Sequence, residues 1–109
     1  MQNFIDYLQQ QQTCHLSEAE TLTAALRTDE AVLEKVRANI CGIFLTLAQT
    51  PNQDDGFLEK MMEKIPAPWH ETLEKAIKHN DFKQETLERV KIAVMAEIKA
   101  KYDVMKEGV

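Results

Sequence analysis

The three histidines are the first candidates for metal chemistry in this chain, because imidazole is a common metal ligand. Helical bundles that hold two metal ions use a Glu followed three residues later by a His, on paired helices. None of His15, His70 and His79 has a Glu at that position. His70 and Glu74 are four residues apart and would share one helix face, which supplies at most two ligands. We therefore predict no metal site and retain His70 and Glu74 as ligand candidates, beside the simpler interpretation of a surface pair.

The two cysteines are the candidate nucleophiles. Cys14 is followed by His15, but adjacent side chains usually point apart, and an activated thiolate needs imidazole or a helix N-terminus at its sulfur. We therefore expect Cys14 to be inert. Cys41 lies in an apolar stretch, where a free cysteine usually behaves as a small hydrophobe. Two cysteines allow at most one internal disulfide, which is not the framework of a small secreted protein.

No catalytic motif is visible. The glycines are scattered at positions 42, 56 and 108, so the sequence has no glycine-rich phosphate loop. No nucleophile elbow stands out either. We predict that the chain is not an enzyme and that it needs no cofactor.

The acidic stretch Asn52-Gln53-Asp54-Asp55-Gly56 resembles half of a calcium loop. With Gly56 at the sixth position, an EF-hand loop needs an acid at its first position and a Glu at its twelfth. Those positions hold Pro51 and Met62. We predict instead that Asp54 or Asp55 caps a helix that begins near Phe57.

The charge distribution restricts the possible partners. The net charge of −5 comes from the first half, because residues 1–56 contain eight acids and three bases while residues 57–109 contain ten of each. An acidic chain binds polyphosphates poorly, so we expect no nucleic-acid partner. The apolar run 40–48 is far shorter than the ~20 residues that span a bilayer, and the first residues lack the basic region of a signal peptide. We expect a cytoplasmic protein without a membrane partner.

A segment without charged side chains indicates which helix lies at the centre of the fold. Residues 38–53 contain no charged side chain, although 28% of the chain is charged. A solvated helix carries charges on its outer face, so this segment is predicted to be packed on two sides, by its own chain or by a second copy. It belongs to a predicted central helix over residues 29–49, whose buried stripe is Leu33, Val36, Ile40, Ile43 and Leu47. Gly42 costs that helix about 1 kcal/mol relative to Ala, which is best explained if another helix crosses close to its backbone.

Capping signals and apolar periodicity predict the other helices. Residues 1–13 are expected to form a short helix and a polar hinge that can move, and a capping box at 17–20 then begins a helix that ends near residue 27. Short helices are predicted at 57–65 and 68–80, with Pro68 at the first helical position. A second capping box at 81–84 begins the longest helix, 82–106, with the stripe Leu87, Val90, Val94, Ile98, Tyr102 and Met105. The sequence therefore predicts a single all-α domain over residues 1–109, a bundle of four to five helices in which the long C-terminal helix packs on the central one.

Two functional hypotheses follow. The preferred one is a non-enzymatic protein–protein interaction or regulatory domain that associates as a homodimer or with another protein, because dimers are common and would cover excess apolar surface. Trp69 and one of the two adjacent methionines, Met61 and Met62, are also compatible with positions in the core. The interface candidates are Ile40, Ile43, Phe44, Leu47, Met61, Met62 and Trp69. The alternative is a helical domain that binds a metal or a small ligand in a pocket beside Gly42, with polar groups from Cys41, His70, Glu74 or Tyr102.

Overall fold

The computed structural model describes residues 1–51, 53–54 and 56–107. In this part of the chain there are five α-helices and no strand, which confirms the all-α prediction. The helices are α1 (Gln2–Ala24), α2 (Thr28–Ala48), α3 (Phe57–Lys64), α4 (Ala67–Lys78) and α5 (Phe82–Glu107). Each of the last four begins and ends within two residues of its predicted bounds.

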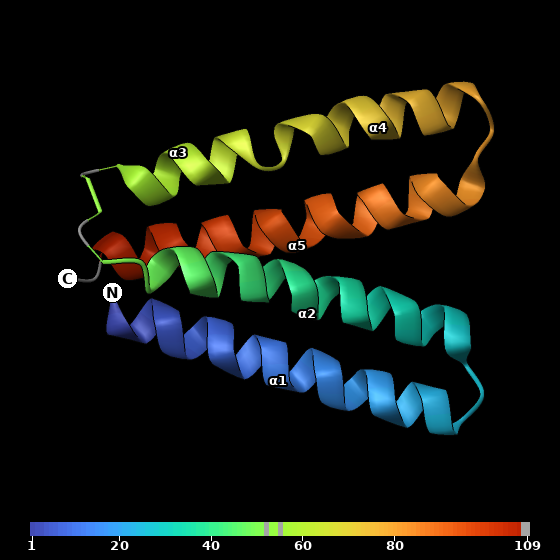
Figure 1. Ribbon diagram of the computed structural model, residues 1–109, viewed down its shortest axis with the longest axis horizontal. Helices are drawn as coiled ribbons and strands as arrows, with labels where there is room; N and C mark the ends of the chain where they lie inside the picture. The colour runs from blue at the N-terminus through green and yellow to red at the C-terminus, as the bar shows by residue number, and fades with distance from the viewer. Residues whose placement is uncertain (52, 55, 108–109) are drawn as a thin grey trace.

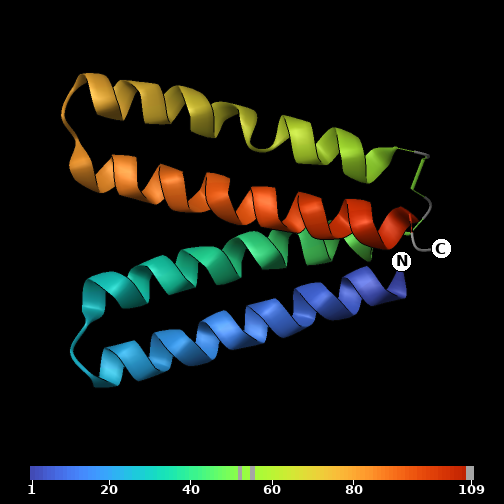
Figure 2. The same cartoon turned by 180° about the vertical axis from the view of Figure 1, so that it is seen from behind.

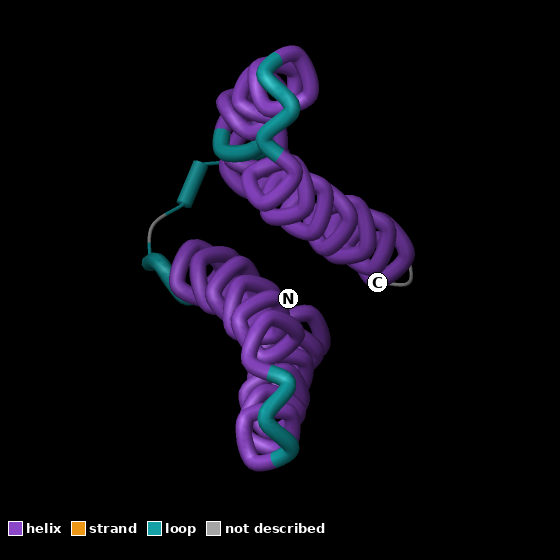
Figure 3. The backbone as a smooth tube through the Cα atoms, turned by 90° about the vertical axis from the view of Figure 1, so that its right-hand side faces the viewer, coloured by secondary structure: helices purple, strands orange, loops and turns teal. Residues whose placement is uncertain are grey.

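The helices form two antiparallel hairpins. α1 returns along α2, and α3 and α4 together return along α5 (Figures 1 and 2). Figure 3 shows the hairpins as two layers, with the chain crossing from one to the other between α2 and α3. α2 contacts both α1 and α5, so the predicted position of the central helix and its packing against the long C-terminal helix are confirmed.

The charge-free segment is buried by its own chain. Ile40, Cys41 and Phe44 each expose 2% or less of their surface. They belong to one core cluster with residues of the other helices: Phe4, Leu8, Leu58, Met62, Val94, Met95, Ile98 and Tyr102. α1 and α5 therefore cover this part of α2, and no second copy is needed to bury it.

The side chain of Gln12 on α1 lies over the glycine in the middle of α2. A Cβ atom added at Gly42 would lie 2.7 Å from Nε2 of Gln12 on α1. The face of α2 toward α1 also contains small buried residues, Ala31 and Ala38. The atoms nearest to the added Cβ belong to the flexible end of Gln12, so α1 covers Gly42 with a side chain and not with its backbone, as the predicted close crossing would require.

The predicted polar hinge near residue 13 is wrong. α1 runs without a break from Gln2 to Ala24, and Ser17 lies inside it, where its carbonyl accepts a 3.2 Å hydrogen bond from Thr21 Oγ1. The reason is tertiary: Phe4, Leu8 and Ala19 are buried where α1 packs on α2 and α5, so the intervening glutamines are held in the helix. The stabilisation from this packing outweighs the local capping signal at Ser17, so no new helix begins there.

The predicted caps of the other helices have different outcomes. The backbone N–H of Gln84 donates a 3.1 Å hydrogen bond to Asp81 Oδ1, so the cap of α5 is confirmed. At α3 the cap position belongs to Gly56, at φ 79°, a conformation that glycine adopts at no steric cost. Asp54 contributes its backbone carbonyl, which accepts the N–H of Phe57 at 3.1 Å, and no side chain of the described residues caps this helix. The alternative cap, Asp55, lies outside the described residues.

None of the described helices is long and apolar enough to cross a membrane.

Candidate functional site

An apolar groove opens where α2 and α5 begin. Both helices start at the same end of the molecule, and their ribbons separate toward that end in Figures 1 and 2. Nearer the other end, Phe44 and Ile98 are fully buried between the hairpins. Toward the beginning of each helix the same stripes continue as half-buried residues, Leu33 and Val36 on α2 and Leu87 and Val90 on α5. The apolar pattern of both helices therefore extends beyond the region in which they pack on each other.

This groove has a volume of about 490 Å³ and is lined by Asp29, Val32, Leu33, Phe82, Lys83, Thr86 and Leu87. Two of the lining apolar residues are largely solvent-exposed: Val32 has 48% and Phe82 has 72% of its surface accessible. A smaller depression of about 290 Å³ shares Thr86 with the groove and includes Arg37, Val90 and Glu97. We call the larger depression the hairpin groove.

The polar side chains of the hairpin groove belong to its two walls. Asp29 comes from α2 and Lys83 comes from α5, and both are exposed. No ion pair among the described residues engages either of them, although Glu30 and Glu85 beside them pair with Arg27 and Arg89. The hairpin groove therefore combines an apolar lining with one acid and one base that are available to a partner.

Three of the predicted interface residues are core residues in this structure. Ile40, Phe44 and Met62 are covered by this chain itself, with at most 3% of their surface exposed. All three belong to the core cluster of this chain, which is the alternative to an interface that the sequence also allowed for them. The other candidates, Ile43, Leu47, Met61 and Trp69, are half-buried and pack against the same core.

None of the predicted interface residues lines the hairpin groove. Val32 lies beside the predicted stripe of α2, and Phe82 lies in the first turn of α5, where only a capping signal was recognised. The sequence signal that could have identified this groove is the presence of apolar residues outside the core stripe of each helix. Their accessibility depends on the angle between the hairpins, which no local pattern encodes.

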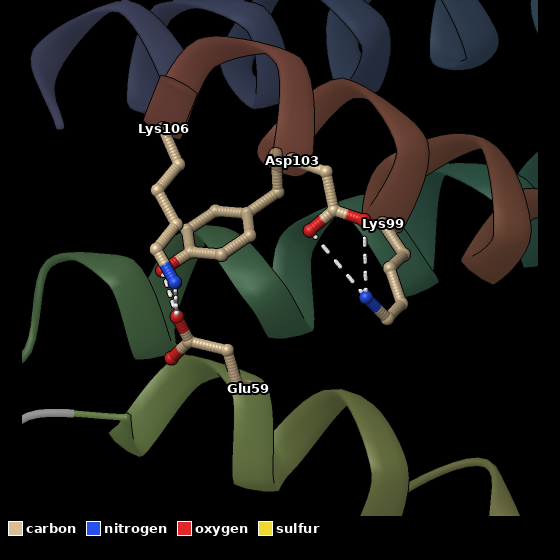
Figure 4. A network of polar contacts seen from close by, with 5 residues as sticks. Glu59, Lys99, Asp103 and Lys106 are labelled. Atoms are coloured by element: carbon tan, nitrogen blue, oxygen red, sulfur yellow. Dashed lines mark hydrogen bonds and ion pairs between the residues drawn. The ribbon is translucent and has the colours of Figure 1, made fainter. Parts of the chain in front are cut away.

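Among the ligand candidates, Tyr102 belongs to a polar cluster between α3 and α5. Its hydroxyl donates a 2.8 Å hydrogen bond to Glu59 Oε1, and Lys106 Nζ donates another of 2.8 Å to the same oxygen. Figure 4 shows Glu59 and Lys106 meeting between the two helices, beside a separate ion pair of Lys99 with Asp103 at 3.1 Å. A depression of about 410 Å³ lies at this cluster and includes Gln53 and Phe57.

The electrostatics of this cluster match its hydrogen bonds. The bonds from Lys106 and then from Tyr102 stabilise the carboxylate and lower the pKa of Glu59 to about 2. Burial, followed by the bond to this carboxylate, raises the pKa of Tyr102 to about 12. The phenol therefore stays protonated and donates, and the carboxylate stays charged and accepts. This arrangement suits a structural tie between α3 and α5 and not proton transfer near neutral pH.

The four ligand candidates do not converge on one site. Cys41 is buried in the core, and burial raises the pKa of its thiol to about 11, which opposes a reactive thiolate. His70 and Glu74 are exposed on α4, whereas Cys41 belongs to α2 and Tyr102 to α5. In the described part of the chain no three His, Cys, Asp or Glu side chains are close enough to hold a metal ion. Both cysteines are free thiols, and Cys14 is exposed.

Two polar clusters were missed from the sequence. Between α1 and α2, Glu34 accepts hydrogen bonds from Arg37 at 2.8 Å and lies 2.6 Å from Nδ1 of His15. On α5, the buried Glu88 pairs with Lys91 at 2.8 Å, and the ammonium of Lys91 lies 5.4 Å from the ring centre of Trp69. Each pairs an acid with a base three residues away, a spacing that the sequence shows, but their burial depends on the neighbouring helix.

Comparison of the chain with protein-family models, with curated proteins and with solved structures found no match.

Proposed function

We propose that this chain is a non-enzymatic protein–protein interaction module and that its binding surface is the hairpin groove. The observation behind the proposal is the exposure of Phe82 and Val32 on either side of a depression lined by Leu33 and Leu87. Exposed apolar patches on soluble proteins commonly mark interaction sites, because leaving them in water costs free energy. Aromatic residues are also enriched among the side chains that contribute most to binding.

The shape of the groove supports a helical partner. The groove lies between two helices of 21 and 26 residues, and its lining is apolar apart from Asp29, Lys83 and Thr86. An amphipathic helix binds such a surface by placing its apolar face in the groove and its polar face in water. A small-molecule pocket would instead need several convergent polar groups, and the ligand candidates of this chain lie on different elements.

The free thiols support a reducing compartment for this module. Cys14 is exposed and Cys41 is buried, and neither forms a disulfide. Proteins of oxidising compartments commonly use their cysteines as disulfides, whereas cytoplasmic thiols stay reduced. We therefore propose that the module acts in the cytoplasm.

Site-specific photo-crosslinking tests the binding surface. Benzoylphenylalanine replaces Phe82 in one variant and Val104 in a control, since Val104 is an exposed apolar residue near the opposite end of the same helix. After irradiation in the producing cell, mass spectrometry identifies the crosslinked peptide. The expected result is an adduct with an apolar helical segment from position 82 and none from position 104. Equal yields at both positions, or no adduct at position 82, would overturn the proposal.

A further inference from the structure

We infer that the occupant of the hairpin groove is a second copy of this chain, bound about a two-fold axis that runs along the groove. The inference rests on the proposed function and adds the identity of the partner. In this arrangement α2 of one copy packs against α5 of the other, and the reverse contact forms at the same time. A two-fold dimer uses the same patch on both subunits, so the patch must be complementary to itself.

The apolar residues of the groove meet this requirement. Each copy contributes two half-buried stripes, one on α2 and one on α5, that continue past the end of their mutual packing. Two copies face to face bring four such stripes together, which is the composition of a four-helix core. The exposed Phe82 on the α5 wall of one copy then faces the exposed Val32 on the α2 wall of the other, and both pairs are repeated by symmetry.

The charges favour contact between α2 of one copy and α5 of the other over contact of each helix with its own counterpart. Asp29 lies on the α2 wall and Lys83 on the α5 wall, and both line the same end of the groove. A two-fold axis along the groove places residues at the same level opposite one another, so Asp29 of each copy meets Lys83 of the other. The whole helices agree in sign, since α2 contains three acids and two bases while α5 contains five acids and six bases. Packing α2 on its own copy would instead bring acids together, at a cost to association.

Charge reversal in two separate variants tests the pairing. The variants are Asp29→Lys and Lys83→Asp, each of which places like charges opposite one another twice in its own dimer. Both residues are exposed, so neither substitution is expected to unfold the monomer. In light scattering at about 100 µM, a concentration at which even a micromolar dimer is well populated, the unmodified chain is expected to have the mass of a dimer. Each variant is expected to dimerise at least about tenfold more weakly.

Mixing the two variants provides the decisive step. In a one-to-one mixture, the lysine introduced at position 29 of one variant would face the aspartate introduced at position 83 of the other, and the native Lys83 would face the native Asp29. The mixture is therefore expected to recover the mass of a dimer, containing one chain of each kind by native mass spectrometry. The controls are Glu20→Lys and Lys75→Asp, which reverse exposed charges on α1 and α4 and are expected to leave the mass unchanged.

Three results would overturn the inference. They are a monomeric unmodified chain, variants that remain dimers, and a mixture that stays monomeric. If the unmodified chain is a monomer while position 82 crosslinks to a different protein, the second-copy inference fails and the proposed function stands. If position 82 gives no adduct and the chain is a monomer, both fail.

Discussion

The hydroxyl of Tyr102 donates a 2.8 Å hydrogen bond to Glu59, a residue 43 positions earlier in the chain. The ring of the same tyrosine packs edge-on against Phe4 with a centroid distance of 5.1 Å. Tyr102 therefore connects α1, α3 and α5 through one side chain. α3 has only eight residues, so its position depends on such contacts more than on its own helical stability.

Removal of this hydroxyl is expected to destabilise the fold modestly. Tyr102→Phe keeps the ring contact with Phe4 and removes the hydrogen bond to Glu59, which we expect to lower the free energy of unfolding by about 1–2 kcal/mol. Urea denaturation followed by circular dichroism measures this change. Tyr7→Phe is the matched control, because Tyr7 is half-buried and its ring stacks on Phe4. If both substitutions have the same effect, the hydrogen bond contributes nothing specific.

The contribution of Glu59 is expected to disappear in acid. Its pKa falls from the ordinary value of 4.5 to about 2 in the folded protein, because the carboxylate accepts bonds from Lys106 and Tyr102. The stabilisation is therefore complete above about pH 4.5 and is lost as the pH falls toward 2. Unfolding curves of the unmodified chain and of Glu59→Gln are expected to differ at pH 6 and to converge near pH 2. A difference that stays constant over this range would contradict the pairing.

Gly42 and Gln12 are expected to be energetically coupled. Alanine at position 42 gains about 1 kcal/mol of helix propensity, but its Cβ would lie 2.7 Å from the amide of Gln12, which must move. Gly42→Ala is therefore expected to stabilise the chain by the full amount only when combined with Gln12→Ala. A double-mutant cycle in urea measures the coupling, and additivity within about 0.3 kcal/mol would exclude it.

Two phenylalanines are expected to respond oppositely to truncation. Phe44 has no exposed surface, so Phe44→Ala leaves a cavity and is expected to cost about 3–5 kcal/mol of folding free energy. Phe82 is 72% exposed, so Phe82→Ala is expected to change the stability of the monomer by at most about 0.5 kcal/mol. Thermal unfolding at low protein concentration measures both. Comparable losses would show that Phe82 belongs to the monomer core and not to a free surface.

The helices themselves follow from local patterns in the sequence. The charge-free residues 38–48, the apolar stripe of residues 87–105 and the cap at Asp81 each depend on periodicity or on short-range hydrogen bonds. They predicted the bounds of α2 to α5 and the central position of α2. The cost of a glycine inside a helix also predicted a neighbouring element at Gly42, and the side chain of Gln12 on α1 lies there.

The continuity of α1 and the location of the exposed apolar surface were decided by the tertiary structure. Ser17 has the local signals of a helix cap, yet burial of Phe4, Leu8 and Ala19 by the neighbouring helices keeps α1 unbroken. Phe44 and Phe82 are the same residue type on helices of similar pattern, and one is core while the other is exposed. The difference lies in the angle between the two hairpins, which arises from the sum of many side-chain contacts between segments far apart in the sequence. Periodicity determines which face of a helix is apolar, whereas only the packed structure determines how far along that face a neighbouring helix reaches.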